Sequence, residues 1–533
     1  MTAIRTPCDE GVVRGAAPPA AGRAAERWVL LASILGSSMA FVDAGVVNVA
    51  LPALQRSLGA GVGDVQWVIA AYSLFLAALL LLGGALGDRL GRKRVFAAGV
   101  ALFAAASAAC GLAPGIRWLI AARAVQGVGA ALLVPGSLAL IGAGFAPERR
   151  GPAIGRWSAW SAATSGIAPV LGGWLIEAAS WRWIFWINLP LAALTLAIAL
   201  ARVPESRDPA ARGALDWPGA ALVTAGLGAL VYGLIASDRA AGTAPTLVPI
   251  GVGVALLAGF VAAERAASNP LVPLSLFRAR TFSGANLLTL FLYAAMGGAL
   301  FFLPFMLIQV HGYGAAEAGG AMVPMIALMF LVSPWAGGVA GRHGARRPLV
   351  AGPLVAAAGY ALLAALAGGR GSYWTTFFPG IATLGLGMAI SVAPLTTTVM
   401  GAVPAARAGL ASGVNNAVAR TAGLLAVAVF GLAGADRFGA ALDRRLAADA
   451  GRVSPAARAV LAGQRDRLAG IEIPPSLPEG ERVALRGVVD GAFGETFRLV
   501  MLLAAGLAVG AGATAATMIA PRPPRGSGLP RAG

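Results

Sequence analysis

Two charged side chains lie inside long apolar stretches, where charge is costly, and they are the residues best suited to chemistry. Asp43 falls within the apolar run 28–52, and Arg123 falls within the apolar run 118–144. A charge in the middle of a membrane helix costs about 3 kcal/mol on insertion scales, so such a residue is a functional candidate. Asp43 could carry a proton, and Arg123 beside it would keep it ionised until the two separate. The alternatives are structural: a permanently paired carboxylate, and an arginine that only braces the fold.

A dense cluster of charges separates two further apolar runs, 65–87 and 95–113. It reads Gly84-Ala85-Leu86-Gly87-Asp88-Arg89-Leu90-Gly91-Arg92-Lys93-Arg94. Glycine permits a tight turn there. Charges pinned between two membrane-length runs must lie in water, and short basic loops stay in the cytoplasm. The turn therefore indicates which face of the membrane is cytoplasmic.

The composition identifies the class of protein. Of 533 residues, 58% are hydrophobic and 12% are charged, and the mean hydropathy is +0.76. A soluble protein would carry roughly a quarter charged residues. Apolar runs of about 20 residues recur, each long enough to cross a bilayer. The strands of a membrane barrel would alternate polar and apolar residues instead. We expect an all-α polytopic membrane protein.

Charge and metal-ligating residues exclude several functions. The net charge is +18, but the arginines are spread over many short loops and form no contiguous basic domain, which argues against a nucleic-acid partner. The surplus instead holds loops in the cytoplasm and contacts anionic lipids. With two cysteines and two histidines the chain offers no disulfide framework, and we expect no metal or redox site.

The hydropathy pattern predicts fourteen membrane helices. Their expected ranges are 28–52, 65–87, 95–113, 118–144, 153–178, 183–201, 216–237, 246–265, 281–309, 317–340, 348–367, 374–400, 408–433 and 497–519. Basic residues gather after helices 2, 4, 6, 8 and 10, and the alternate short loops carry few. Both termini are therefore expected in the cytoplasm of a plasma-membrane protein, as tails over 1–27 and 520–533. The run after the first tail is too long for a signal peptide and contains Asp43.

An internal repeat divides the chain into two halves. The segment Gly337–Arg347 is a degraded copy of the charged turn, in which Gly341 replaces Asp88. The same offset carries the start of helix 1 onto the start of helix 9. We expect a six-helix half over 28–201 and a second over 281–519, with 216–265 as an inserted helix pair. The polar segment 434–496 is predicted to be an extracellular loop with short helices over 436–449 and 454–470, more simply a solvated hairpin than a gating lid.

Three motifs resemble one transporter family. The charged turn follows the pattern G-x-L-x-D-R-x-G-R-[RK] and resembles the signature loop of the major facilitator superfamily. The stretch around Asp43, ending Asn48-Val49-Ala50-Leu51-Pro52, resembles helix 1 of its fourteen-helix drug:proton antiporter branch. The stretch Arg123–Ala131 resembles the helix-4 motif R-x-x-Q-G-x-G-A-A. The resemblance implies a major facilitator fold, with the substrate site between the halves near the bilayer midplane.

The same resemblance implies roles for other residues. The conformational switch would consist of Gly84, Asp88, Arg89, Gly91 and Arg92, with Asp88 docking on the start of helix 13 near Arg407. The antiporter motif of helix 5 would comprise Gly155, Pro169, Gly172 and Gly173, although Thr164 and Ala168 replace two of its glycines.

Polar groups within the predicted membrane region are candidates for the substrate cavity. These are Gln126, Asn415, Asn416 and Arg420, with hydrogen bonding between helices as the structural alternative for the asparagines.

Taken together, these features predict a secondary active exporter that exchanges a proton on Asp43 for a small lipophilic or cationic substrate. We expect a monomer driven by the proton gradient, with no cofactor, since the chain lacks a G-x-x-x-x-G-K-[ST] nucleotide loop. A proton-coupled importer on the same fold and a non-transporting membrane sensor are the alternatives. Scarce histidine and cysteine disfavour an enzyme.

Overall fold

The computed structural model describes residues 23–207, 215–235, 244–369, 371–403, 407–449 and 453–521. Within these ranges the regular structure is helical throughout, and 13 helices are long and apolar enough to cross a membrane. One further long helix, Pro147–Ala178, is rich in Ser, Gly and Trp and therefore less apolar. With it, each of the fourteen predicted spans coincides with a helix, and the all-α prediction is confirmed. The predicted tails lie mostly outside the described residues, although the first helix already begins at Arg23.

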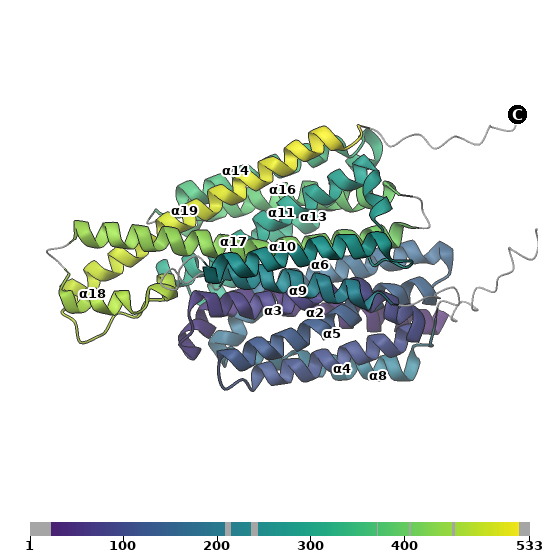
Figure 1. Cartoon of the computed structure of the whole chain (residues 1–533), viewed down its shortest axis with the longest axis horizontal. Coiled ribbons are helices and arrows are strands. Elements are labelled where there is room, and N and C mark those ends of the chain that lie inside the picture. Colours follow the sequence, from purple (N-terminus) through teal and green to yellow (C-terminus); the bar gives the residue numbers. More distant parts are fainter. Residues whose placement is uncertain are drawn as a thin grey trace, which may run out of the picture.

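The helices form two halves and an inserted pair (Figure 1). The first half comprises α2 (Arg23–Leu58), α3 (Val62–Leu90), α4 (Arg92–Gly111), α5 (Ile116–Gly144), α6 (Pro147–Ala178), α7 (Trp183–Trp186) and α8 (Asn188–Arg202). The inserted pair comprises α9 (Trp217–Ile235) and α10 (Ala244–Ala266). The second half comprises η2 (Leu274–Arg278), α11 (Arg280–Phe305), η3 (Met306–Val310), α12 (Ala315–Gly320), α13 (Val323–His343), α14 (Arg346–Leu366), α15 (Tyr373–Thr376), α16 (Phe378–Gly401), α17 (Ala408–Ala448), α18 (Pro455–Ala462), η5 (Arg465–Gly470) and α19 (Glu479–Met518).

Glycines set the close approach of neighbouring helices within the first half. A Cβ atom on Gly83 of α3 would lie 2.0 Å from the carbonyl oxygen of Ala131 on α5. A Cβ atom on Gly127 of α5 would lie 2.4 Å from the carbonyl oxygen of Tyr72 on α3. Larger residues would push these backbones apart, so the small residues fix the geometry of the α3–α5 pair.

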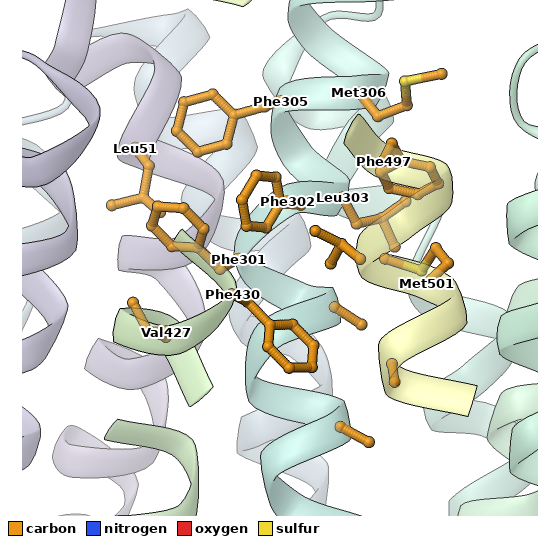
Figure 2. Close-up of a cluster of buried hydrophobic side chains, with 14 of the residues drawn as sticks. Leu51, Phe301, Phe302, Leu303, Phe305, Met306, Val427, Phe430, Phe497 and Met501 are labelled. Carbon is orange, nitrogen blue, oxygen red and sulfur yellow. The ribbon is translucent and has the colours of Figure 1, made fainter. Parts of the chain in front are cut away.

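A cluster of buried aromatic and aliphatic side chains joins the two halves (Figure 2). Leu51 of α2 belongs to the same buried core as Phe301 and Phe305 of α11. The Phe301 and Phe302 rings meet edge to face, with centroids 5.2 Å apart. On the other side of α11, Phe497 of α19 completes the cluster.

Hydrogen bonds between the halves concentrate at one end of the molecule. The Gln66 side chain of α3 donates to the carbonyl oxygen of Val427 on α17 (3.2 Å). The Ala316 amide of α12 donates to the Glu177 carboxylate on α6 (2.9 Å). Both contacts lie at the end opposite the Gly84–Arg94 turn. Among the described residues, the halves are therefore bonded together at the end remote from the charged turn.

The predicted loop over 434–496 is largely helical, and the two helices that flank it extend into it. α17 continues to Ala448 and α19 already begins at Glu479, and both project beyond the other helices at the left of Figure 1. The reason is amphipathic spacing: α17 buries Phe438, Ala441 and Leu442 at helical intervals against α19. The short helices expected over 436–449 and 454–470 fall on the end of α17 and on α18 with η5.

The connection between α17 and α19 also differs from a solvated hairpin. In and just after η5, Leu468, Ala469 and Ile471 are at most 2% exposed and belong to the main hydrophobic core. The Gln55 side chain of α2 donates to the carbonyl oxygen of Arg467 (3.1 Å), and Gln309 of η3 donates to Gln55 (3.1 Å). This connection therefore covers the joint between the halves.

Candidate functional site

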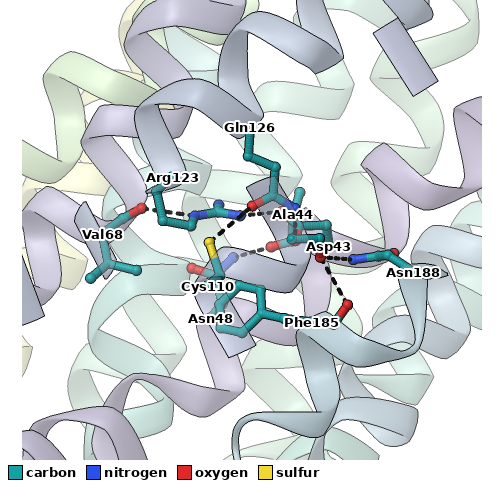
Figure 3. Close-up of polar contacts among 10 residues, drawn as sticks. Asp43, Ala44, Asn48, Val68, Cys110, Arg123, Gln126, Phe185 and Asn188 are labelled. Atoms are coloured by element: carbon teal, nitrogen blue, oxygen red, sulfur yellow. Dashed lines mark hydrogen bonds and ion pairs between the residues drawn. The ribbon is translucent and has the colours of Figure 1, made fainter. Parts of the chain in front are cut away.

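The structure brings Asp43, Arg123 and Gln126 into one hydrogen-bonded cluster (Figure 3). Arg123 Nη1 lies 2.5 Å from Asp43 Oδ2 and 2.7 Å from Gln126 Oε1, to which it donates in both cases. Gln126 Nε2 in turn donates to Asp43 Oδ1 (2.9 Å). The three residues are at most 1% exposed. The ion pair is thus sealed from solvent, and each member is bonded to both others.

Arg123 makes contacts beyond the carboxylate. Its Nε donates to the carbonyl oxygen of Val68 on α3 (3.1 Å). Its guanidinium carbon stands 4.2 Å from the centre of the Tyr72 ring and 5.9 Å from that of Phe185. Stacking of this kind suits the planar, weakly hydrated guanidinium. Removing Asp43 would leave a buried positive charge uncompensated, at a typical cost of about 3–5 kcal/mol.

Packing of α2 on α6 holds the Asp43 backbone in place. A Cβ atom on Gly45 would lie 2.6 Å from the Ala168 Cβ. One residue further along α2, Val46 meets Gly172, where a Cβ atom would lie 2.8 Å away. The helix that carries the carboxylate is therefore in direct contact with the helix of the antiporter motif, through residues two and three positions from Asp43.

Several polar groups near the cluster were not singled out from the sequence. Cys110 of α4 donates to Gln126 Oε1 (3.7 Å), and the buried Tyr72 hydroxyl has no hydrogen-bond partner within the described chain. Nearby, Asn188 donates to the Ser107 hydroxyl, which donates to the carbonyl oxygen of Phe185. In the sequence, these residues could be recognised as polar residues within otherwise apolar runs. Their convergence on one site depends on how α3, α4, α5 and α8 are rotated.

The charged turn is held by a residue that the sequence did not single out. Within the turn, Asp88 pairs with Arg92 (2.8 Å). Glu205, just after α8, accepts a hydrogen bond from the Lys93 amide at the start of α4 (3.1 Å). Gly91 adopts φ 116°, and a Cβ atom there would lie 2.8 Å from the Glu205 carboxyl. Glu205 thus caps the positive end of α4, and the turn needs glycine at 91.

The docking of Asp88 on the start of helix 13 remains a prediction. Its partner in this structure is Arg92, and residues 404–406, which precede α17, lie outside the described ranges. Gly84 lies near Pro135 of α5, and Arg89 is partly buried at the end of α3.

Three of the four antiporter-motif residues lie at helix interfaces. Gly172 faces α2, as described above. A Cβ atom on Gly173 would lie 2.2 Å from the carbonyl oxygen of Ala315 on α12. A Cβ atom on Gly319 of α12 would lie 2.2 Å from the carbonyl oxygen of Pro169 on α6. Gly155, by contrast, has open space where a Cβ would be. α6 therefore packs against α2 on one side and against the second half on the other.

The predicted cavity residues are not gathered at one place. Gln126 is fully buried in the ion-pair cluster, so it does not line an open cavity. Asn415 bonds to Asn286 and Thr289 of α11, which is the structural alternative, and the amide of Asn416 donates to the carbonyl oxygen of Ser412 on its own helix. Arg420 stands 5.9 Å from the centre of the Phe41 ring and connects α17 with α2. In the described chain, no cluster of three or more His, Cys, Asp or Glu side chains could hold a metal ion.

Comparison with known proteins gives one consistent family. A family model described as Major Facilitator Superfamily matches residues 33–427. The chain is 39% identical over 405 residues to "Multidrug resistance protein Stp" of Mycobacterium tuberculosis, an alignment covering 75% of this chain and 74% of the relative. It is 33% identical over 502 residues to the "Tetracenomycin C resistance and export protein" of Streptomyces glaucescens, covering 93% of this chain and 92% of the relative.

A solved structure shares the fold. The bacterial homologue of the human lysosomal transporter Spinster superposes with a TM-score of 0.61 at 18% identity. The match covers 92% of this chain and 98% of that chain. Two six-helix halves therefore account for most of the molecule.

Proposed function

The chain belongs to the major facilitator superfamily, and from this premise we propose that it exports lipophilic drugs or antibiotics in exchange for protons. The resemblance to the drug:proton antiporter branch is confirmed, since its relatives are multidrug- and antibiotic-resistance transporters. It is accordingly a multi-pass membrane transporter and not an enzyme. Proton exchange, direction and orientation are the additional elements of our proposal.

The observation that carries the proposal is the sealed Asp43–Arg123–Gln126 cluster. The buried Asp43 carboxylate accepts hydrogen bonds from two side chains, and one of them, Arg123, is a buried cation. Protonation would remove the charge that holds Arg123, so the bonds of the cluster would weaken. A proton and a substrate that favour different states of the halves can then drive exchange, because only differential affinity shifts a conformational equilibrium.

A chain of contacts supports communication between Asp43 and the joint. Gly45 and Val46, next to Asp43, pack on α6, and α6 packs on α12 through Gly173. Movement of α2 on protonation of Asp43 would therefore displace α6 and, through α6, the contact between the two halves. These continuous contacts provide a physical route for coupling, and the Gly173→Ala variant tests how strongly they contribute to it.

We further propose that the charged turn faces the cytoplasm and that the structure is closed on the outer side. The basic turn and its cytoplasmic preference support the first statement. The hydrogen bonds of Gln66 and Glu177, at the opposite end, support the second. In this state Asp43 is fully buried and ion-paired. An outward-open state would admit the proton, and the inward-open state would exchange it for substrate.

The substrate class that we propose is neutral or amphiphilic and lipophilic, not dicationic. Exporters of dications often use several acidic residues in the membrane, whereas Asp43 is the one acidic residue that lies far from the ends of the predicted spans. The relatives are named as multidrug- and antibiotic-resistance proteins, which supports a drug or antibiotic as the substrate but says nothing about its charge.

The deciding experiment compares wild-type protein with Asp43→Asn in proteoliposomes under an imposed pH gradient. Lipophilic antibiotics are added, and proton release is followed with a pH-sensitive dye. We expect release from the wild type and none from the variant, because asparagine cannot carry a proton. Asp64→Asn is the matched control, since Asp64 accepts a hydrogen bond from the Gly61 amide at the start of α3 and takes no part in the Asp43 cluster. Undiminished coupling in Asp43→Asn would refute the assignment, and accumulation of substrate together with protons would indicate import.

A further inference from the structure

Arg420 of α17 carries a positive charge deep in the membrane region, where the two halves meet. It lies twelve residues after Ala408, the first residue of α17, and therefore about 18 Å along the helix axis. The hydrocarbon core of a bilayer is about 30 Å thick, so this depth is well below the lipid headgroups. The Arg420 guanidinium stands 5.9 Å from the centre of the Phe41 ring, which belongs to α2 in the first half.

No carboxylate of the chain is available to pair with Arg420. By sequence position, Asp43 is the one acidic residue far from the ends of the predicted spans. Both of its oxygens are already bonded, Oδ1 to Gln126 and Oδ2 to Arg123, and its side chain is fully buried. Within the described ranges, the Arg420 side chain forms neither an ion pair nor a hydrogen bond. Two positive charges thus share one negative charge in this part of the membrane region. A charge at such a depth pairs with another group of the protein or marks the path of a substrate.

The register between α3 and α17 places a buried hydroxyl at the depth of Arg420. Two contacts fix the register of these antiparallel helices: Gln66 with Val427 and Leu81 with Gly413. Tyr72 of α3 therefore lies opposite the turn of α17 that contains Arg420. The Tyr72 hydroxyl is buried and has no hydrogen-bond partner among the described residues, and its ring lies under the Arg123 guanidinium. Leaving such a hydroxyl without an acceptor is costly, and a ligand oxygen would remove that cost.

Two further donors lie at this level on α11 and α17. Two contacts fix the register of these parallel helices: Thr289 with Asn415 and Gly297 with Gly423. Tyr293 of α11 therefore also lies at the depth of Arg420, and its hydroxyl makes no hydrogen bond to the described part of the chain. On α17 itself, Asn416 lies four residues before Arg420 and hence on the same face. Its amide donates one of its two hydrogens to its own helix, which leaves the second for a ligand.

We propose, on the basis of the export function proposed above, that Arg420 binds an anionic group of the substrate. The transported class is then lipophilic organic acids, with a carboxylate or an acidic hydroxyl on an aromatic body. The planar fork of donors on a guanidinium fits a carboxylate. The aromatic neighbours suit an apolar body, since Phe41 also packs edge to face on Trp157 of α6, with ring centres 6.4 Å apart. The bound anion supplies the negative charge that Arg420 lacks.

The position of the site links binding of the acid to the state of the transporter. Arg420 belongs to the second half, and Phe41 belongs to the first. Movement of the halves therefore changes the surroundings of the guanidinium. A ligand held at such a joint has different affinities for the two states, which is what drives a conformational exchange.

The test measures binding to the full-length protein in lipid vesicles at neutral pH, where carboxylates are ionised. The probes are pyrenebutyrate and its methyl ester, followed by energy transfer from tryptophan, with naphthylacetate and its methyl ester as competitors. For Arg420→Gln we expect the Kd of each acid to rise by about tenfold or more, as for the loss of a hydrogen bond to a charged group. The Kd of each ester should stay unchanged. Acid and ester partition differently into lipid, so each ligand is compared between proteins.

Two variants separate charge from packing. Arg420→Lys keeps the charge and should keep tighter binding of the acid than Arg420→Gln. Arg444→Gln is the matched control on the projecting part of the same helix, where Arg437 and Arg445 also bind Glu495, and it should leave every Kd unchanged. Equal losses for acid and ester in Arg420→Gln, or a lysine variant that binds like the glutamine variant, would overturn the inference. So would a wild type that binds neither acid.

Thermal unfolding without ligand distinguishes a binding residue from a structural one. Arg420→Gln removes a positive charge that has no carboxylate partner, so it should unfold at the same temperature as the wild type or higher. A large loss of stability, or failure to fold, would identify the arginine as a brace of the joint and overturn the inference. The binding assay needs no proton gradient. A failed Asp43→Asn assay therefore refutes proton exchange and leaves acid binding intact, whereas loss of the acid preference refutes the substrate class alone.

Discussion

Arg123 satisfies three different acceptors at once, and this sets what can replace it. Its guanidinium donates to the Asp43 carboxylate, to Gln126 and to the carbonyl oxygen of Val68, while its face stacks on Tyr72. A lysine keeps the positive charge but presents one compact ammonium group on a flexible stem. The charge alone therefore does not reproduce the site.

We predict that Arg123→Lys lowers the free energy of unfolding by about 1–3 kcal/mol, the usual cost of buried acceptors left unsatisfied. Substrate-driven proton release should fall by about tenfold, the factor to which about 1.4 kcal/mol, a value within this range, corresponds. Thermal unfolding and the proteoliposome assay measure the two effects. Arg117→Lys is the matched control, since Arg117 is exposed on the same helix. Wild-type coupling in Arg123→Lys would show that only the charge matters.

Helix α6 is the element that connects the carboxylate helix with the other half of the molecule. Two consecutive residues of α6 contact different neighbours: Gly172 contacts α2, and Gly173 contacts α12. Any side chain at 173 must displace the backbone of Ala315, since backbone atoms cannot move aside as the end of a flexible side chain can. Closure at this end of the molecule therefore depends on a glycine at 173.

Gly173→Ala should shift the equilibrium away from the closed arrangement described here. Spin labels on Ala179→Cys and Ser372→Cys, which are exposed positions in opposite halves at this end, report the separation. With Cys8 and Cys110 replaced, we expect one short distance in the wild type and an added longer distance in Gly173→Ala. Gly155→Ala on the same helix has open space around its Cβ and should leave the distribution unchanged. Identical distributions in all three proteins would refute this role for α6.

The long helices α17 and α19 give the molecule two dissimilar ends. At one end they project as a helical pair, and η5 covers the joint between the halves. At the other end lies the charged turn, held by Glu205. In the orientation proposed above, the projecting pair is extracellular and the charged turn is cytoplasmic.

Single cysteines can test this orientation in intact cells. Val483 in the projecting part of α19 is 68% exposed. Leu90, at the end of α3 within the charged turn, is 55% exposed. In a background without Cys8 and Cys110, a membrane-impermeant maleimide should label Val483→Cys at once. It should label Leu90→Cys only after the membrane is disrupted. The reverse pattern would invert the topology and with it the assignment of the closed end.

The sequence by itself determined the helices, their number and the main candidate residues. A run of about 20 apolar residues in a membrane must bond its own backbone, so each run becomes a helix whatever its neighbours are. Asp43 and Arg123 stood out for the same local reason, because a charge in such a run is costly.

Only the tertiary structure decided which side chains meet. Gln126 was expected in a cavity and is sealed in the ion pair, and Glu205 attracted no attention as sequence. Each depends on the rotation and depth of helices far apart in the chain, which packing sets and local composition does not. The same holds for η5, whose polar neighbourhood predicted a solvated hairpin. Leu468, Ala469 and Ile471, in and just after η5, are part of the hydrophobic core because α17 and α19 position this segment over the joint between the halves.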